Sequence, residues 1–161
     1  GSMGAGHIEE VAAQLLPQLT VNDRLLLVCG SNEKLRQSLL GEHRMDPRAV
    51  ILGFTDRVSL LMDAADLLLT KAGGLTSTEA AVKNIPLVHT NPIPGCETEN
   101  LQFFSELGIS LARKDVKEAA QVAATLCADP QACSEMAGRQ AREINARAFD
   151  MAYAKAETAN A

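Results

Sequence analysis

The chain has 161 residues, of which 47% are hydrophobic and 22% charged, values typical of one soluble globular domain. Its net charge is −5 with both signs interspersed, which argues against nucleic acid as a partner. Four cysteines without a CxxC pair and three scattered histidines predict reduced thiols in a cytoplasmic protein, and no metal site.

Short apolar runs alternate with amphipathic stretches along the chain. The apolar runs predict strands at residues 24–30, 49–54, 66–72, 85–90 and 109–113. The stretches after them predict helices at residues 32–43, 56–65, 75–84, 97–108, 116–128 and 130–156. The strand runs are continuously apolar, which is the pattern of parallel strands covered on both faces. The sequence therefore predicts an α/β fold with a parallel sheet flanked by helices.

Ligands bind at the carboxyl ends of strands in such sheets, and one strand end has an unusual composition. Gly73 and Gly74 follow the strand at residues 66–72, and Thr76, Ser77 and Thr78 open the next helix. A helix N-terminus suits phosphate, and glycines let the backbone approach a ligand closely. The alternative is a capped helix after a tight turn, which explains one hydroxyl and one glycine but not three and two. We therefore expect an anion site whose hydroxyls cap the helix or donate to the anion.

Glu79 lies three residues after Thr76, on the same face of the predicted helix. Its carboxylate could simply interact with the helix dipole. It also has two acceptor oxygens, which match the two neighbouring hydroxyls of a ribose. One helix start would then hold the phosphate and the ribose of a single nucleotide.

Other strand ends carry small or polar residues that suit a ligand less specifically. After the fourth strand, prolines and Gly95 lead into an acidic helix start, which suits a sugar but is also typical of an ordinary first turn. Residues 1–6 are glycine-rich and would form a second phosphate loop if a strand preceded them. The remaining strand ends are Gly30-Ser31-Asn32 and Gly53-Phe54, for which a loop with a helix cap at Asn32 or Asp56 is the alternative.

Taken together, these stretches resemble the C-terminal domain of the GT-B glycosyltransferases of family 28, especially the processive diacylglycerol glucosyltransferases and monogalactosyldiacylglycerol synthases. The resemblance rests on TKAGGLTSTEA at residues 70–80 and NPIPGCETENLQFF at residues 91–104. The family pattern is close to S/T-K-P-G-G-L/I-T-x-x-E-A, then P-x-P-G-Q-E-x-x-N. Ala72 stands where proline is usual, and Cys96 where glutamine is common. VCGSNEKL and ILGFTDRV match two further family stretches, so the resemblance covers about residues 1–130 and favours a native origin for residues 1–3.

The resemblance implies that residues 1–161 form the Rossmann-like C-terminal half of a GT-B fold, which binds a UDP-sugar. It also implies a role for each matching residue. The ribose and uracil would be bound by Glu79, Gly53 and Phe54, with Gly30, Ser31 and Asn32 at the rim of the site. The diphosphate would be bound by Gly73, Gly74, Leu75 and Thr76 together with Ser2, Gly4 and Ala5, and the donor hexose by Glu99 and Asn100.

By this resemblance, the full-length protein would transfer a hexose from UDP-hexose to a lipid acceptor, with diacylglycerol favoured. The acceptor site and the catalytic base would belong to an N-terminal domain absent from this chain, so the fragment alone would be inactive. Enzymes of this kind generally use no bound metal or other cofactor. The full-length protein would lie peripherally on the inner face of the membrane.

Three alternatives stay open. The enzyme that adds N-acetylglucosamine in lipid II synthesis is related, but it usually has a glutamine pair where Glu99 and Asn100 stand. A GT-B UDP-sugar epimerase would need proton-transfer groups at the sugar, for which His89 and Glu97 are poor, unclustered candidates. A non-enzymatic nucleotide-binding module would bind nucleotide without preference for the sugar.

Overall fold

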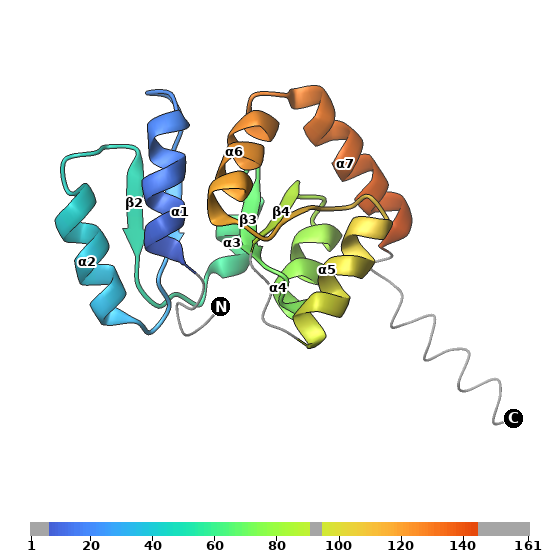
Figure 1. Cartoon of the computed structure of the whole chain (residues 1–161), viewed down its shortest axis with the longest axis horizontal. Helices are drawn as coiled ribbons and strands as arrows, with labels where there is room; N and C mark the ends of the chain where they lie inside the picture. Colours follow the sequence, from blue (N-terminus) through green and yellow to red (C-terminus); the bar gives the residue numbers. More distant parts are fainter. Residues whose placement is uncertain (1–6, 91–94, 145–161) are drawn as a thin grey trace, which may run out of the picture.

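The computed structural model describes residues 7–90 and 95–144, in which helices and strands alternate along the chain (Figure 1). The strands are β1 (Leu25–Val28), β2 (Ala49–Leu52), β3 (Leu68–Lys71), β4 (Leu87–Thr90) and β5 (Leu111–Arg113). The helices are α1 (Ile8–Leu15), η1 (Leu16–Gln18), α2 (Glu33–His43), α3 (Val58–Asp63), α4 (Gly74–Val82), α5 (Cys96–Glu106), α6 (Val116–Cys127) and α7 (Pro130–Glu143). All five predicted strands are confirmed. The predicted helices are confirmed too, except that the end of the last one lies outside the described residues.

The strands form two sheets. Every strand pairing within these sheets is parallel, as predicted. β1 pairs with β2, with Leu25 opposite Ala49. In the other sheet β4 lies between β3 and β5, with Val88 opposite Leu69 and Leu111. Because parallel strands end at the same edge, the loops that follow the strands of each sheet gather along one edge of that sheet.

Helices cover both faces of the three-stranded sheet. Val88 of β4 packs with Ala120 of α6 and Leu15 of α1 on one face. Its neighbour Leu87 packs with Ala81 of α4 and Phe104 of α5 on the opposite face. All four residues of β4 are buried, as the continuously apolar pattern predicted.

Among the described residues, helices cover only one face of the two-stranded sheet. Leu27 of β1 packs with Ala12 of α1 and Leu39 of α2 on that face. On the other face Leu26 and Val50 lie opposite each other, 40% and 37% exposed. The prediction that all strands are covered on both faces is therefore wrong for β1 and β2. The reason is that α1 and α2 pack on the same face, and the described residues place no helix on the other.

α7 is fixed to the three-stranded sheet through buried polar contacts. The side-chain amide of Gln140 donates to the carbonyls of Ile85 and Ile109, at 2.8 and 3.0 Å. Both bonds satisfy backbone acceptors next to strands, where an unpaired carbonyl would be costly. In the part of the chain that the structure describes, no helix is both long and apolar enough to cross a membrane.

Candidate functional site

The corner between β3 and α4 is open to solvent. β3 ends at Lys71, and α4 begins at Gly74 with Gly73 as its N-cap. A Cβ added to Gly73 would meet no atom within 4 Å. Gly73 has an extended backbone with φ −74°, so its lack of a side chain leaves room for a ligand and is not required by the turn itself.

The first turn of α4 presents backbone donors at this corner. The first hydrogen bond within the helix runs from the N–H of Ser77 to the carbonyl of Gly73, at 3.0 Å. The N–H groups of Gly74, Leu75 and Thr76 therefore have no earlier turn to donate to. Gly74 and Leu75 are exposed and Thr76 is half-buried. Such a cluster of donors, at the positive end of the helix dipole, suits the anion site predicted here.

The hydroxyls of this segment do not behave as predicted. No side-chain hydroxyl caps α4, because its N-cap is Gly73. Ser77 is fully buried, and its Oγ lies 2.9 Å from Nε2 of His89. The prediction that all three hydroxyls cap the helix or contact the anion is therefore wrong for Ser77, which faces the sheet. Thr76 and Thr78 are at least partly accessible.

His89 of β4 lies beneath α4, away from solvent. Its ring is fully buried and meets the ring of Phe104 edge-on, with 5.5 Å between centroids. Burial lowers the pKa of His89 from 6.5 to about 4, so the ring is neutral at pH 7. A neutral, buried imidazole bonded to Ser77 is poorly placed to move protons on a sugar, which counts against the epimerase alternative.

We expect His89 to make the protein less stable in mild acid. The unfolded chain protonates this residue near pH 6.5, whereas the folded state resists protonation down to about pH 4. Its contribution is therefore complete above pH 6.5 and is lost as the pH falls towards 4, with a slope of at most ~1.4 kcal/mol per pH unit. Urea unfolding at several pH values should show a shallower slope for His89→Gln. Equal slopes in the two proteins would contradict the assignment.

A partly buried ion pair ties the start of α5 to the end of β3. Nζ of Lys71 lies 2.6 Å from Oε1 of Glu97, whose side chain is only 9% exposed. Close by, the side-chain amide of Asn100 donates to the carbonyl of Ala72 at 3.0 Å. The predicted acidic first turn of α5 is confirmed, with Glu97 nearly buried and paired with a lysine. These two bonds bring the first turn of α5 against the β3–α4 corner.

The structure thus brings the predicted diphosphate, ribose and hexose residues of α4 and α5 to the same corner. Asn100 lies beside the corner, since its Nδ2 is 3.5 Å from the position that a Cβ on Gly74 would take. Glu99, in the same helix turn, is exposed. Glu79 lies one turn further along α4 and is half-buried. The amide of Asn100 uses one N–H for the backbone, so its carbonyl oxygen and its second N–H remain for a ligand.

The predicted residues after β1 and β2 lie at the end of the other sheet. Asn32 caps α2, since its Oδ1 accepts from the N–H of Leu35 at 3.0 Å, so the helix-cap alternative is confirmed there. Gly30 has a φ of +59°, a left-handed conformation that favours glycine. Phe54 is 72% exposed, which leaves its ring accessible to a nucleobase such as uracil.

Gly53 follows β2 and packs closely against a neighbouring side chain. A Cβ on Gly53 would lie 3.3 Å from Cδ of Arg36, so this glycine accommodates a packed arginine. Ser2, Gly4 and Ala5 lie outside the described residues. Lys71 is not among the predicted site residues, although a single cation at the carboxyl end of an apolar strand was a usable signal.

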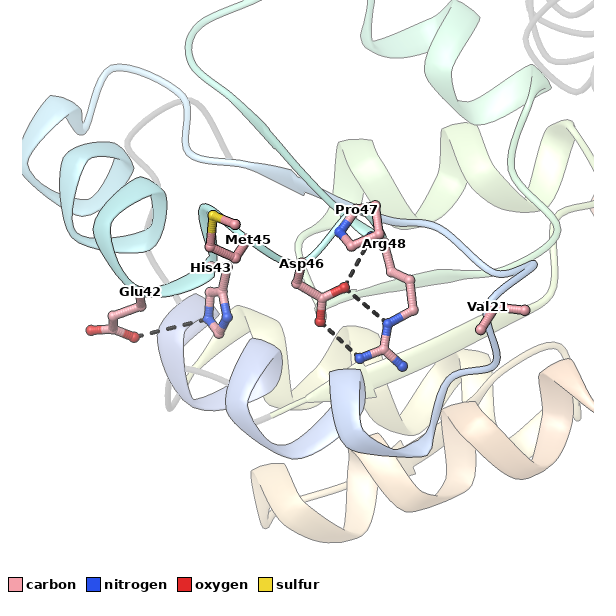
Figure 2. Close-up of a pocket in the computed structure, with 7 residues that line it drawn as sticks. All are labelled: Val21, Glu42, His43, Met45, Asp46, Pro47 and Arg48. Carbon is pink, nitrogen blue, oxygen red and sulfur yellow. Dashed lines mark hydrogen bonds and ion pairs between the residues drawn. The ribbon is translucent and has the colours of Figure 1, made fainter.

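An open hollow of about 530 Å³ lies elsewhere, beside the amino ends of β1 and β2 (Figure 2). Arg48 bonds Asp46 through Nε and Nη2, at 2.9 and 2.7 Å, and these bonds lower the pKa of Asp46 to about 2. A third bond, from Nη1 to the carbonyl of Leu19, holds the arginine in place at 2.7 Å. The charges of Arg48 and Asp46 are therefore paired with each other. No predicted site residue lines the hollow. Its lining residues are Val21, Glu42, His43, Met45, Asp46, Pro47 and Arg48.

Two solved structures share the fold of this chain. The Anabaena protein Alr3699/HepE in complex with UDP aligns over 99% of this chain and 46% of its own, with a TM-score of 0.65 and 18% identity. WaaG, a glycosyltransferase involved in lipopolysaccharide biosynthesis, aligns over 91% of this chain and 40% of its own, with a TM-score of 0.69 and 18% identity. At this identity the likeness establishes the fold, and it confirms the predicted Rossmann-like architecture.

Sequence comparisons identify the family. A processive diacylglycerol beta-glucosyltransferase from Staphylococcus aureus strain JH9 is 33% identical over 107 residues, which are 66% of this chain and 27% of that protein. The chain thus corresponds to about a quarter of the length of such relatives. The glycosyltransferase family 28 C-terminal domain matches residues 1–127, which include the β3–α4 corner and the start of α5. The chain belongs to the family of glycosyltransferase family 28 C-terminal domains.

Proposed function

We propose that this domain binds the UDP-hexose donor of a glycosyltransferase, and that the full-length protein transfers the hexose to a lipid, with diacylglycerol as the favoured acceptor. The observation that carries the proposal is the family match over residues 1–127, with an open helix N-terminus at its most specific motif. The similar Staphylococcus aureus protein is named for diacylglycerol glucosylation, and the similar Anabaena protein has been solved with UDP and with UDP-glucose.

The geometry supports one assignment of donor groups to residues. The free N–H groups of Gly74, Leu75 and Thr76 would bind the diphosphate. Glu79, one turn further along the same helix, would accept from the two ribose hydroxyls. The hexose would then lie towards the first turn of α5, where Glu99 is exposed and Asn100 keeps a free carbonyl oxygen.

In the proposed reaction the acceptor hydroxyl attacks the anomeric carbon, and the bond from that carbon to the UDP oxygen breaks. Negative charge then grows on the leaving diphosphate, where preorganised N–H donors and a helix dipole are most effective. This role needs no cofactor. The base that takes the acceptor proton would lie in a part of the protein outside this chain, as would the surface that meets the membrane.

Calorimetric titration of the chain with nucleotides tests the proposal. We expect UDP and UDP-hexoses to bind, and ADP to bind at least roughly tenfold more weakly, because a purine is larger than the uracil proposed to lie against Phe54. UDP-glucose and UDP-galactose should bind more tightly than UDP if the hexose contacts α5. Equal binding of UDP and ADP would contradict the proposal and favour the general nucleotide module. Tightest binding of UDP-N-acetylglucosamine would favour the lipid II alternative.

A further inference from the structure

The glycine pair that opens α4 has no side chains of its own to hold it in place. Gly73 is the N-cap, and Gly74 is the first residue of the helix. Glycine loses more conformational freedom on folding than any other residue, so a turn built on two glycines is easily deformed. The three N–H groups proposed for the diphosphate lie in this turn, and they bind an anion best when their directions are fixed beforehand. The turn therefore needs support from the residues around it.

Two side-chain hydrogen bonds support the glycine pair, one on each side. Ahead of the pair, the side-chain amide of Asn100 donates to the carbonyl of Ala72 at 3.0 Å. After the pair, Oγ of Ser77 and Nε2 of His89 lie 2.9 Å apart and share a hydrogen bond. The N–H of Ser77 also makes the first bond within α4, to the carbonyl of Gly73. The side chain of Ser77 is therefore anchored at the point where the first helical turn closes.

His89 is a rigid support for this bond. It lies one residue before the end of β4, the middle strand of its sheet, opposite Thr70 on one side and Ala112 on the other. Its ring is fully buried and packs edge-on against Phe104. A side chain enclosed in a close-packed core has few other rotamers open to it. The sheet, through His89, thus sets the position of Ser77.

Only one of the two ring nitrogens of His89 takes part. Among the described residues, Nδ1 has no hydrogen-bond partner, although it is buried. A buried polar atom without a partner costs free energy, which a leucine at this position would avoid. Leucine would also suit the neighbours, since Leu87 and Phe104 belong to the apolar cluster on this face of the sheet. A histidine that is costly to the core calls for a role beyond packing.

We infer that His89 is a positioning residue for the donor site: through Nε2 it holds Ser77, and through Ser77 it holds the first turn of α4 in the conformation that binds the diphosphate. The inference rests on the proposed function, which assigns the diphosphate to that turn. His89 does not reach the donor, since its ring is fully buried. Its effect on binding must therefore pass through the bond to Ser77.

Two substitutions of His89 separate this role from packing. The side-chain amide of glutamine reaches about as far as Nε2, whereas the shorter amide of asparagine reaches about as far as Nδ1. His89→Gln therefore keeps a partner for Ser77, and His89→Asn loses it, although each variant buries one amide in place of the ring. Calorimetry should show UDP binding weakened about fivefold in His89→Asn, the loss of one hydrogen bond, and changed less than about twofold in His89→Gln.

Ser77→Ala tests the other end of the same bond and leaves the sheet unaltered. It should weaken UDP binding as much as His89→Asn does. The variant with both changes should bind UDP no more weakly than either single variant, because all three break the same hydrogen bond. Additive losses would mean that His89 does not act through Ser77.

Amide hydrogen exchange tests the same step without nucleotide. The N–H at position 77 bonds within the first turn of α4, and the N–H of Lys83 bonds to Glu79 at the other end of the helix. Relative to Lys83, exchange at position 77 should be at least roughly fivefold faster in His89→Asn and Ser77→Ala, and unchanged in His89→Gln.

Several outcomes would overturn the inference. Equal UDP affinities of His89→Asn and His89→Gln would mean that the bond through Nε2 does not matter for binding, whether both lose affinity or neither does. Equal exchange at position 77 in these two variants would mean that His89 does not hold the first turn. If the unaltered chain fails to bind UDP, the proposed function fails, and the exchange comparison still decides whether His89 fixes that turn.

Discussion

Replacing Glu79 with alanine is expected to weaken UDP binding roughly ten- to a hundredfold, because a hydrogen bond to a charged group contributes about 1.5–3 kcal/mol. Glu79 lies on α4, one turn beyond the N–H groups proposed for the diphosphate. Its side chain is half-buried, so a bound ribose would shield the interaction from solvent. Calorimetry with the variant and the unaltered chain measures the loss directly.

A second nucleotide makes the experiment specific for the ribose. If Glu79 accepts from both ribose hydroxyls, 2′-deoxy-UDP should bind more weakly than UDP to the unaltered chain. In Glu79→Ala the two nucleotides should bind alike, because the discriminating carboxylate is gone. A variant that lost affinity but still distinguished UDP from 2′-deoxy-UDP would place Glu79 elsewhere.

Glu99→Ala provides the matched control, because it removes another glutamate from a helix beside the same corner. Glu99 is exposed in the first turn of α5 and is assigned to the hexose. Its removal should lower the affinity for UDP-hexose and leave the affinity for UDP unchanged. Loss of UDP affinity in both variants would indicate a general electrostatic effect and would contradict the separate assignments.

The architecture could be predicted from sequence because it depends on local patterns. Each strand is a short apolar run, such as residues 85–90, and each is followed by an amphipathic stretch that needs an apolar surface to cover. The order of the runs then specifies parallel strands. The exposure of Leu26 could not be predicted in this way, because it depends on the faces on which α1 and α2 pack.

The candidate site could be predicted in outline but not in its internal bonds. Gly73 and Gly74 mark the open corner in the sequence, since few other residues leave such space. The sequence does not reveal that Ser77 faces inward to His89, because both helix starts and helix interiors accept serine. Lys71 and Glu97 are 26 residues apart, and only the packing of α5 on the corner brings them together.

Replacing Lys71 with methionine is expected to lower the free energy of unfolding by about 2 kcal/mol, because the nearly buried Glu97 carboxylate loses the cation that lies beside it. Glu97, the partner that remains, has a side chain only 9% exposed. Glu97→Gln in the Lys71→Met background removes that charge and should restore much of the loss. Urea unfolding of the two single variants and the double variant measures the coupling.

Lys83→Met is the matched control for Lys71→Met, since Lys83 also pairs with a carboxylate, that of Asp63. The Asp63 side chain is 56% exposed, so its charge remains hydrated when the lysine is removed, and the expected loss is below about 1 kcal/mol. Equal losses in the two lysine variants, or additive effects of Lys71→Met and Glu97→Gln, would mean that the Lys71–Glu97 pair contributes no more than a surface pair. If the Lys71–Glu97 pair is strongly coupled, Lys71→Met should also weaken UDP-hexose binding more than UDP binding. The reason is that this pair positions α5, the helix that carries Glu99 and Asn100.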